Sequence, residues 1–204
     1  MDAKELIKQA KEYEEQGKKD KAYIYYLEAA LAEDDGEAVY KLAKMYMHGD
    51  YVGEDFEKAS HYFEVAYERG YDLPKHLFVF IGSSYENGDA YCPKDPEIAM
   101  KWYKMAADLG VDYAYACMGE LYYKGEGVEV DYDKAYEFFV KAGEEETLPL
   151  YYLGLMHELG QVVPQSTEKA REYYTRIIDE HSEIKDVDLH YELAEKRLAS
   201  LGTM

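Results

Sequence analysis

The sequence predicts an all-α fold, a right-handed α/α solenoid of helix-turn-helix repeats that covers residues 1–204 as a single domain. The first observation is a recurring pattern, in which a small residue precedes an aromatic one by three positions and the motif Ala-x-x-x-aromatic follows. The second is a helix-capping residue that recurs four positions before the alanine of each later copy. Patterns repeated every few tens of residues are typical of solenoids, and two signals in one register support each other.

The small residue of each first helix is expected to let the second helix of its repeat cross closely. These residues are Ala10, Ala43, Gly82, Gly119 and Gly154. Glycine inside a helix costs up to about 1 kcal/mol relative to alanine, so three glycines imply a packing reason. The predicted units are a hairpin at 3–33, repeats at 37–73, 75–112, 113–146 and 148–182, and a C-terminal capping helix at 186–201.

The second helices of the four later repeats are expected to begin at residues whose side chains accept a hydrogen bond from a free backbone N–H. These N-cap residues are Asp55, Asp95, Asp131 and Ser166. Pro96 follows Asp95 at the first helical position, where its missing N–H does no harm. The C-terminal helix has no partner helix, and a terminal unit with a polar outer face is typical of a cap.

Loop length separates two kinds of repeat. The small residue and the alanine lie 12 residues apart in the first hairpin, from Ala10 to Ala22, which resembles a tetratricopeptide repeat. They lie 16 or 17 residues apart in the later copies, where the loop at 125–128 is Gly-Glu-Gly-Val and Lys134-Ala135 follows. This combination resembles the Sel-one-like repeat family over residues 37 to about 180. The resemblance implies an array that assembles protein complexes.

The composition is acidic and rich in tyrosine, with a net charge of −20 and 24 Tyr. Such a surface repels phosphates and anionic lipid, so neither a nucleic acid nor a membrane is expected as a partner. Two interpretations of the acidity stay open, which are solubility through self-repulsion and a basic protein or peptide partner. The N-terminus lacks the apolar region of a signal peptide and no 18-residue apolar run exists, so we expect a cytoplasmic protein.

No residue pattern in the chain predicts catalysis. The six histidines lack metal-ligand spacing, and we expect a structural role for His157, which occupies an aromatic position of the repeat. Cys117 is expected to be buried and inert, whereas Cys92 is expected to be exposed in its loop. We therefore expect no metal, no cofactor and no enzyme activity.

The resemblance to tetratricopeptide arrays implies that first helices line a concave binding face. Four positions of each first helix then make up the predicted concave face. Its candidate binding residues are Tyr40, Lys44, Met47, Val79, Ser83, Glu86, Tyr113, Glu120, Tyr123, Leu148, Tyr151, Leu155 and Glu158. The hypothesis is a non-catalytic scaffold or adaptor that binds a partner peptide or helix there, although part of the face could instead pack against neighbouring layers or the terminal helix.

Two other hypotheses belong to different classes. One is a hydrolase of small molecules or cell-wall fragments, which would need a pocket that holds a pair of groups with perturbed pKa, and the sequence offers no candidate for that pair. The other is a self-assembling structural protein that stacks on further copies of itself. The scaffold hypothesis predicts a monomer or weak homo-oligomer, whereas the self-assembly hypothesis predicts assembly that increases with concentration.

Overall fold

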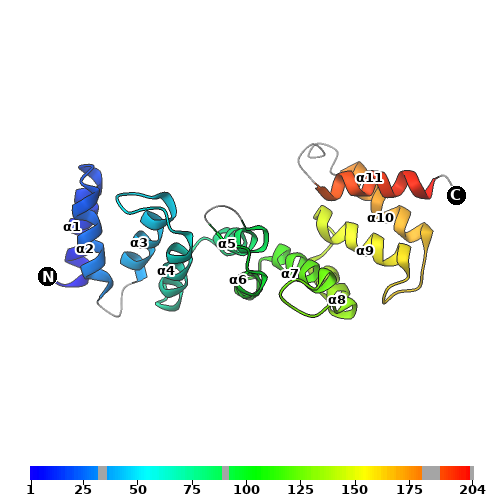
Figure 1. The fold of residues 1–204 in the computed structure, drawn as a ribbon, viewed down its shortest axis with the longest axis horizontal. Coiled ribbons are helices and arrows are strands. Elements are labelled where there is room, and N and C mark those ends of the chain that lie inside the picture. Colours follow the sequence, from blue (N-terminus) through cyan, green and yellow to red (C-terminus); the bar gives the residue numbers. More distant parts are fainter. Residues whose placement is uncertain (32–35, 89–91, 181–188, 203–204) are drawn as a thin grey trace. The chain divides into compact units, whose positions relative to one another are not determined.

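The computed structural model describes residues 1–204 except 32–35, 89–91, 181–188 and 203–204, and the described residues form eleven α-helices and no strands (Figure 1). The all-α prediction is confirmed. The helices are α1 (Ala3–Glu15), α2 (Lys19–Ala30), α3 (Gly36–His48), α4 (Phe56–Glu68), α5 (Lys75–Asn87), α6 (Pro96–Asp108), α7 (Asp112–Lys124), α8 (Tyr132–Ala142), α9 (Thr147–Leu159), α10 (Thr167–Glu180) and α11 (Leu189–Leu201).

The helices group into two compact units. The first unit comprises Met1–Leu77 and Asn87–Lys94, and the second comprises Phe78–Glu86 and Asp95–Met204. In the first unit α1 pairs with α2, α3 pairs with α4, and α2 packs on α3. In the second unit α7 pairs with α8 and α9 with α10, while α6 packs on α7, α8 packs on α9, and α11 packs on α9 and α10. Each unit is therefore built from stacked helix hairpins, and a single domain over 1–204 stays a prediction.

The close helix crossings predicted at the small residues are confirmed at the three glycines, Gly82, Gly119 and Gly154. A Cβ atom on Gly154 would lie 2.8 Å from Cε1 of Tyr174 on the second helix of its repeat. The corresponding distance from Gly119 to Cε1 of Phe139 is also 2.8 Å. Atoms at such distances overlap, so the aromatic side chain of the second helix fills the space that a side chain on the first helix would need.

The predicted N-caps are confirmed in all four later repeats. Each N-cap side chain accepts a hydrogen bond from the backbone N–H three residues on, at distances of 2.9 Å for Asp55, 3.0 Å for Asp95, 3.0 Å for Asp131 and 3.2 Å for Ser166. The backbone N–H of each N-cap also donates to a carbonyl of the first helix. These carbonyls belong to Tyr46 (3.0 Å), Tyr85 (2.7 Å), Tyr122 (3.0 Å) and His157 (2.8 Å). The N-cap of each of these second helices is thus bonded to the first helix of its own repeat.

The Lys-Ala pair of the repeat has a structural explanation. Lys58 Nζ lies 2.8 Å from Oδ2 of the N-cap Asp55 and 5.4 Å from the centre of the Tyr46 ring. Lys134 makes the same two contacts in its own repeat, at 2.9 Å and 5.1 Å. Hydrogen bonds from the Lys58 side chain and backbone lower the pKa of Asp55. The lysine therefore joins the cap of the second helix to the end of the first.

Candidate protein-interaction surface

The predicted concave face is accessible on α3 in the first unit. Lys44 is exposed, and Tyr40 and Met47 are half-buried. The Tyr40 ring stacks on Tyr71, with 4.7 Å between ring centres and 25° between planes. Lys44 Nζ lies 6.0 Å from the centre of the Tyr40 ring. The surface of α3 thus presents a solvated cation beside a pair of rigid aromatic rings.

In the second unit, α5 and α7 leave part of the predicted face accessible. Val79, Ser83 and Glu86 on α5 are half-buried, and Tyr113 on α7 is exposed. Tyr123, also on α7, is half-buried and donates a hydrogen bond from its hydroxyl to a side-chain oxygen of Gln161, at 3.0 Å. These side chains are positioned by helix packing and retain contact with solvent.

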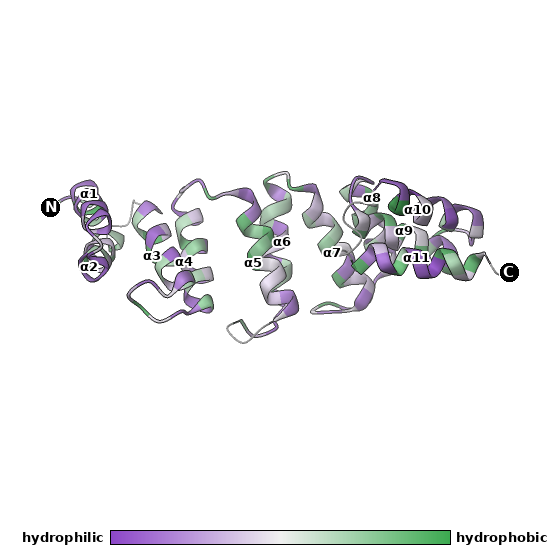
Figure 2. Cartoon of the chain, turned by 90° about the horizontal axis from the view of Figure 1, so that it is seen from above, coloured by the Kyte–Doolittle hydropathy of each residue, from purple (hydrophilic) through white to green (hydrophobic). Residues whose placement is uncertain are grey.

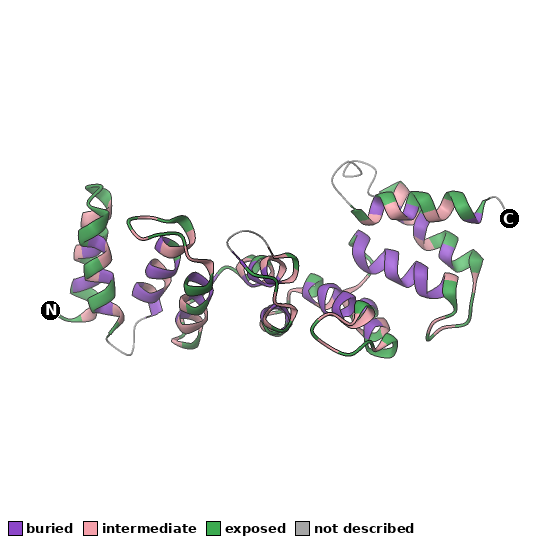
Figure 3. Cartoon of the chain, viewed as in Figure 1, coloured by how far each residue is buried: buried purple, intermediate pink, exposed green. Residues whose placement is uncertain are grey.

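Helix α9 differs because every residue from 147 to 157 is buried (Figure 3). Three of the four predicted face residues on α9, Leu148, Tyr151 and Leu155, are 4%, 5% and 6% exposed. A helix that is apolar on all sides is typical of a core helix rather than a surface helix. The side of α9 that was predicted to bind a partner must therefore be covered by another element.

That element is α11, which carries both hydrophilic and hydrophobic residues (Figure 2). It packs on α9, and its residues Tyr191, Ala194 and Leu201 are buried in the same apolar cluster as the three α9 residues. We call the residues on which α11 lies the α9 surface. They are Leu148, Tyr151, Leu155 and Glu158 of α9, together with Glu120 of α7. The predicted cap helix therefore lies on first helices, over residues predicted to bind a partner.

Two polar contacts join α11 to the α9 surface. His190 Nε2 lies 3.8 Å from Oε1 of Glu120, and Arg197 Nη1 donates to Oε1 of Glu158 at 3.0 Å. The His190 ring also lies 5.4 Å from the Tyr151 ring, centre to centre. The two basic residues are seven positions apart, which is about two helical turns, so they point to the same side of α11.

Glu120 is 8% exposed and is the one carboxylate classed as buried among the described residues. It accepts a hydrogen bond from the Tyr152 hydroxyl at 2.9 Å and pairs with Lys124 Nζ at 2.6 Å. Burial acts to raise the pKa of Glu120, but contacts with His190 and Lys124 outweigh it and lower the pKa to about 2. The carboxylate is therefore charged, and α11 supplies part of its compensation.

Three glutamates, each four positions after the small residue of its first helix, are bound within their own repeats. Each accepts a hydrogen bond from a tyrosine hydroxyl of the second helix: Tyr26 to Glu14 at 2.7 Å, Tyr103 to Glu86 at 2.5 Å, and Tyr174 to Glu158 at 2.9 Å. In the other two repeats the aromatic residue is Phe, and the glutamate is replaced by Met47 or Tyr123. Sequence reasoning missed this pairing, although comparison of the five repeats would have found it. The pairing shows that these glutamates have a packing role.

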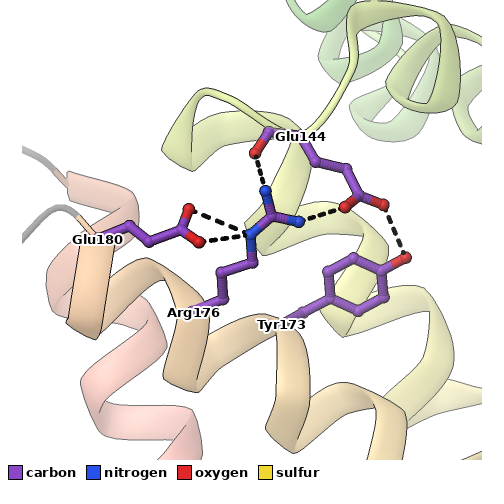
Figure 4. A network of polar contacts seen from close by, with 4 residues as sticks. All are labelled: Glu144, Tyr173, Arg176 and Glu180. Atoms are coloured by element: carbon purple, nitrogen blue, oxygen red, sulfur yellow. Dashed lines mark hydrogen bonds and ion pairs between the residues drawn. The ribbon is translucent and has the colours of Figure 1, made fainter.

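A separate polar network joins the loop before α9 to α10 (Figure 4). Arg176 contacts the Glu144 carboxylate, donates to the Glu144 carbonyl at 3.0 Å, and donates to Oε1 of Glu180 at 2.9 Å. Tyr173 donates to Glu144 at 3.4 Å. A cavity of about 320 Å³ opens beside these groups. Because the guanidinium is neutralised by two carboxylates, the arrangement fits a clamp on the loop better than a catalytic pocket.

A family model, the Sel1 repeat, matches the chain five times. The matched residues are 15–34, 36–71, 79–111, 113–146 and 150–181. The chain belongs to the Sel1 repeat family. The first match lies in the hairpin whose shorter spacing resembles a tetratricopeptide repeat, so the family pattern extends to both units.

Solved structures of Sel1-like repeat proteins share the fold, which confirms the α/α solenoid. A Sel1 repeat protein from Oxalobacter formigenes aligns with a TM-score of 0.67 and 23% identity, over 87% of this chain and 51% of that one. The protective antigen c5321 from uropathogenic Escherichia coli aligns with a TM-score of 0.59 and 23% identity, over 98% of this chain and 46% of that one. The chain thus spans about half the length of these solved relatives.

Two curated relatives come from Arabidopsis thaliana and carry the names ERAD-associated E3 ubiquitin-protein ligase component HRD3A and HRD3B. The first is 34% identical over 74 residues, which are 36% of this chain and 11% of the relative. The second is 29% identical over 85 residues, which are 41% of this chain and 14% of the relative. The chain therefore corresponds to a small part of either relative.

The two cysteines of this Sel1 repeat protein are both buried. Cys117 is 4% exposed, and burial raises the pKa of its thiol, as expected for an unreactive side chain. The prediction that Cys92 is exposed in its loop is wrong, because the residue is only 1% exposed. A cysteine thiol behaves as a small apolar group, so it can be buried outside a helix as well as within one.

His157 has the structural role that its position in the Sel1 pattern predicts. It is buried, and its ring stacks on Tyr173 with 5.8 Å between centres and 17° between planes. In the repeat at 37–73, Tyr46 stacks on Tyr62 in the same way, at 5.6 Å and 15°.

Within the described ranges, no three His, Cys, Asp or Glu side chains are grouped to hold a metal ion. None of the described helices is both long and apolar enough to cross a bilayer.

Proposed function

We propose that this Sel1 repeat protein is a non-catalytic scaffold or adaptor that binds a peptide or helix of a protein partner on its predicted concave face. Sel1 repeats generally mediate protein–protein interactions, and their fold is generally non-enzymatic. The names of the Arabidopsis relatives describe components of a ubiquitin-ligase assembly, which supports a role in assembling complexes. A cytoplasmic location remains a prediction from the sequence.

The observation that carries the proposal is the chemistry of the same register positions in the two units. On α3 these positions hold Tyr40, Lys44 and Met47, which are accessible to solvent. Rigid aromatic rings with adjacent charges are favoured at protein interfaces, because they supply contact area at a small entropic cost. On α9 the equivalent positions already hold a helix, α11. The net charge of −20 favours a basic partner.

A charge-reversal pair tests this function. Lys44→Glu alters the exposed position on α3, and Lys104→Glu makes the same change at an exposed position on α6. Partners captured by the full-length wild type would be compared with those captured by each variant and by Tyr40→Ala, with quantification by mass spectrometry. We expect a specific partner to be retained by Lys104→Glu and depleted at least fivefold by the two α3 changes. The same captured set with all four proteins would refute binding at this face.

A second candidate function, self-association, is favoured by one surface feature. Ile24, Leu27 and Leu31 lie on one side of α2 and its C-cap, opposite the buried side, and are 55%, 39% and 78% exposed. An apolar stripe of this kind promotes contacts between copies. Light scattering over a range of concentrations tests the idea with Leu27→Glu as the variant. A monomer at every concentration would eliminate it.

A further inference from the structure

The α9 surface carries an occupant, and its chemistry specifies what else would fit. We propose that the α9 surface is a receptor for a basic amphipathic helix, and that α11 occupies it in cis as a displaceable substitute for the helix of a partner. This inference rests on the proposed scaffold function and assigns a partner class to one part of the concave face. The receptor residues come from α7 and α9, and the occupant lies in the same compact unit.

The apolar residues of α11 pack against those of α9 at defined positions along both helices. Leu148, Tyr151 and Leu155 recur along one side of α9, and the α11 residues Tyr191 and Ala194 join them in one buried cluster. Tyr191 is 4% exposed and Ala194 is 0% exposed, so the helix approaches closely at the alanine. If α11 departed, an apolar surface would face solvent, which soluble proteins avoid unless another chain covers it. An open α9 surface would therefore favour the binding of another helix.

Charge fixes the register of the occupant. Glu120 and Glu158 stand at two ends of the contact and bind His190 and Arg197, which are two helical turns apart. The occupant pattern is therefore basic-aromatic-x-x-small-x-x-basic along a helix. A partner helix with lysine or arginine at both basic positions would satisfy both glutamates with permanent charges, which the histidine of α11 does not provide.

The hold of α11 on this surface is limited, which makes exchange feasible. Only three of its 13 residues are buried, and Leu189 at its start is 63% exposed. Arg171 of α10 donates to the carbonyl of Leu201 and fixes its far end. Isolated helices of about this length are marginally stable in water, so α11 depends for its structure on packing against α9 and α10. A helix with more buried apolar area and two permanent cations would compete effectively.

The experiment uses full-length protein and a fluorescent synthetic peptide of residues 189–202 as the probe. Ala194→Glu places a charge in the contact and should undock α11, whereas Ala199→Glu makes the same change at an exposed position of the same helix. We expect fluorescence anisotropy to show at least tenfold tighter peptide binding by Ala194→Glu than by wild type or Ala199→Glu. The reason is that competition in cis is removed, so the peptide meets an open surface.

A charge exchange then tests the register. A peptide carrying Arg197→Glu should bind the Ala194→Glu protein at least tenfold more weakly. The protein with Glu158→Arg in addition should recover binding of that altered peptide and lose the unaltered one. A general loss of structure would weaken the binding of both peptides. It could not produce the exchange of preference between the proteins with and without Glu158→Arg.

Three results would overturn the inference. Equal peptide affinity for wild type and Ala194→Glu would show that α11 does not compete. Loss of the cooperative thermal transition in Ala194→Glu would make α11 a fixed structural cap. Dimers of the wild type that exchange α11 would make a second copy the occupant. None of these results bears on Lys44, which lies in the other unit, so the scaffold proposal and this inference fail separately.

Discussion

The first helices α3 and α9 occupy the same place in the repeat but present different surfaces. The position after the small residue is Lys44 on α3, which is exposed, and Leu155 on α9, which is 6% exposed. Three positions before the small residue, Tyr40 is half-buried and Tyr151 is 5% exposed. The repeat register therefore determines which side of a helix a residue occupies. The polarity of the residues at those positions indicates whether another helix covers them.

The largest predicted effect comes from truncating the same register position in the two helices. Leu155→Ala removes a buried side chain and should lower the free energy of unfolding by about 2–5 kcal/mol. Lys44→Ala changes an exposed side chain and should alter it by no more than about 0.5 kcal/mol. Urea denaturation followed by circular dichroism measures both. Equal effects would mean that α9 is not covered as described.

Acid should weaken the second unit through Glu120. Its pKa falls from 4.5 to about 2 on folding, so the folded state binds fewer protons than the unfolded state between these values. The resulting stability is present above pH 4.5 and is lost as the pH falls toward 2, and the shift corresponds to about 3 kcal/mol. Urea denaturation at several pH values should give a flatter profile for Glu120→Gln than for wild type. Identical profiles would refute the charged state of Glu120.

Exchanging glycine and alanine at the small-residue position should destabilise the protein in either direction. Gly154→Ala would ordinarily gain up to about 1 kcal/mol of helix propensity, but its Cβ would lie 2.8 Å from the Tyr174 ring. We expect a net destabilisation of about 1–3 kcal/mol from overpacking. The control is Ala43→Gly on α3, which should cost about 1 kcal/mol through propensity and lost packing. Thermal unfolding of both variants measures this, and a stabilised Gly154→Ala would contradict the close crossing.

The smallest predicted effect concerns the tyrosine–glutamate pairs. Tyr174→Phe removes one hydrogen bond to Glu158, which keeps its ion pair with Arg197, so the loss should be about 1–1.5 kcal/mol. Phe63→Tyr makes the reverse change in the repeat that has Met47 in place of glutamate, and should also destabilise, because the buried hydroxyl gains no carboxylate acceptor. Both changes are measured by thermal unfolding. A stabilised Phe63→Tyr would show that the pairing has no structural meaning.

The fold was predictable from the sequence because its determinants are local and repeated. Gly82, Gly119 and Gly154 meet aromatic side chains of their own repeats, and the four N-caps bond to amides three residues away. Each signal recurs at a fixed spacing, so a repeat that departs from the pattern at one position can still be recognised by comparison with the others. The pattern fails at Cys92, which lies in a loop where the copies differ and burial follows no period.

The site was less predictable because α11 lies outside the repeat period. Its first described residue is Leu189, and nothing in the spacing of the repeats determines which helices it covers. The composition of α9 carried a usable signal, since Leu148, Tyr151 and Leu155 are too apolar for an open face, whereas Lys44 is not. The pairing of tyrosine with glutamate was also present in the sequence, but only comparison between repeats reveals it.

The central claim is that α11 lies on the α9 surface, and nuclear magnetic resonance of the full-length protein tests it most directly. The rings of His190 and Tyr151 lie 5.4 Å apart, centre to centre. We predict nuclear Overhauser contacts between their ring protons in the wild type and their loss in Ala194→Glu. Absence of these contacts in a folded wild type would contradict the account.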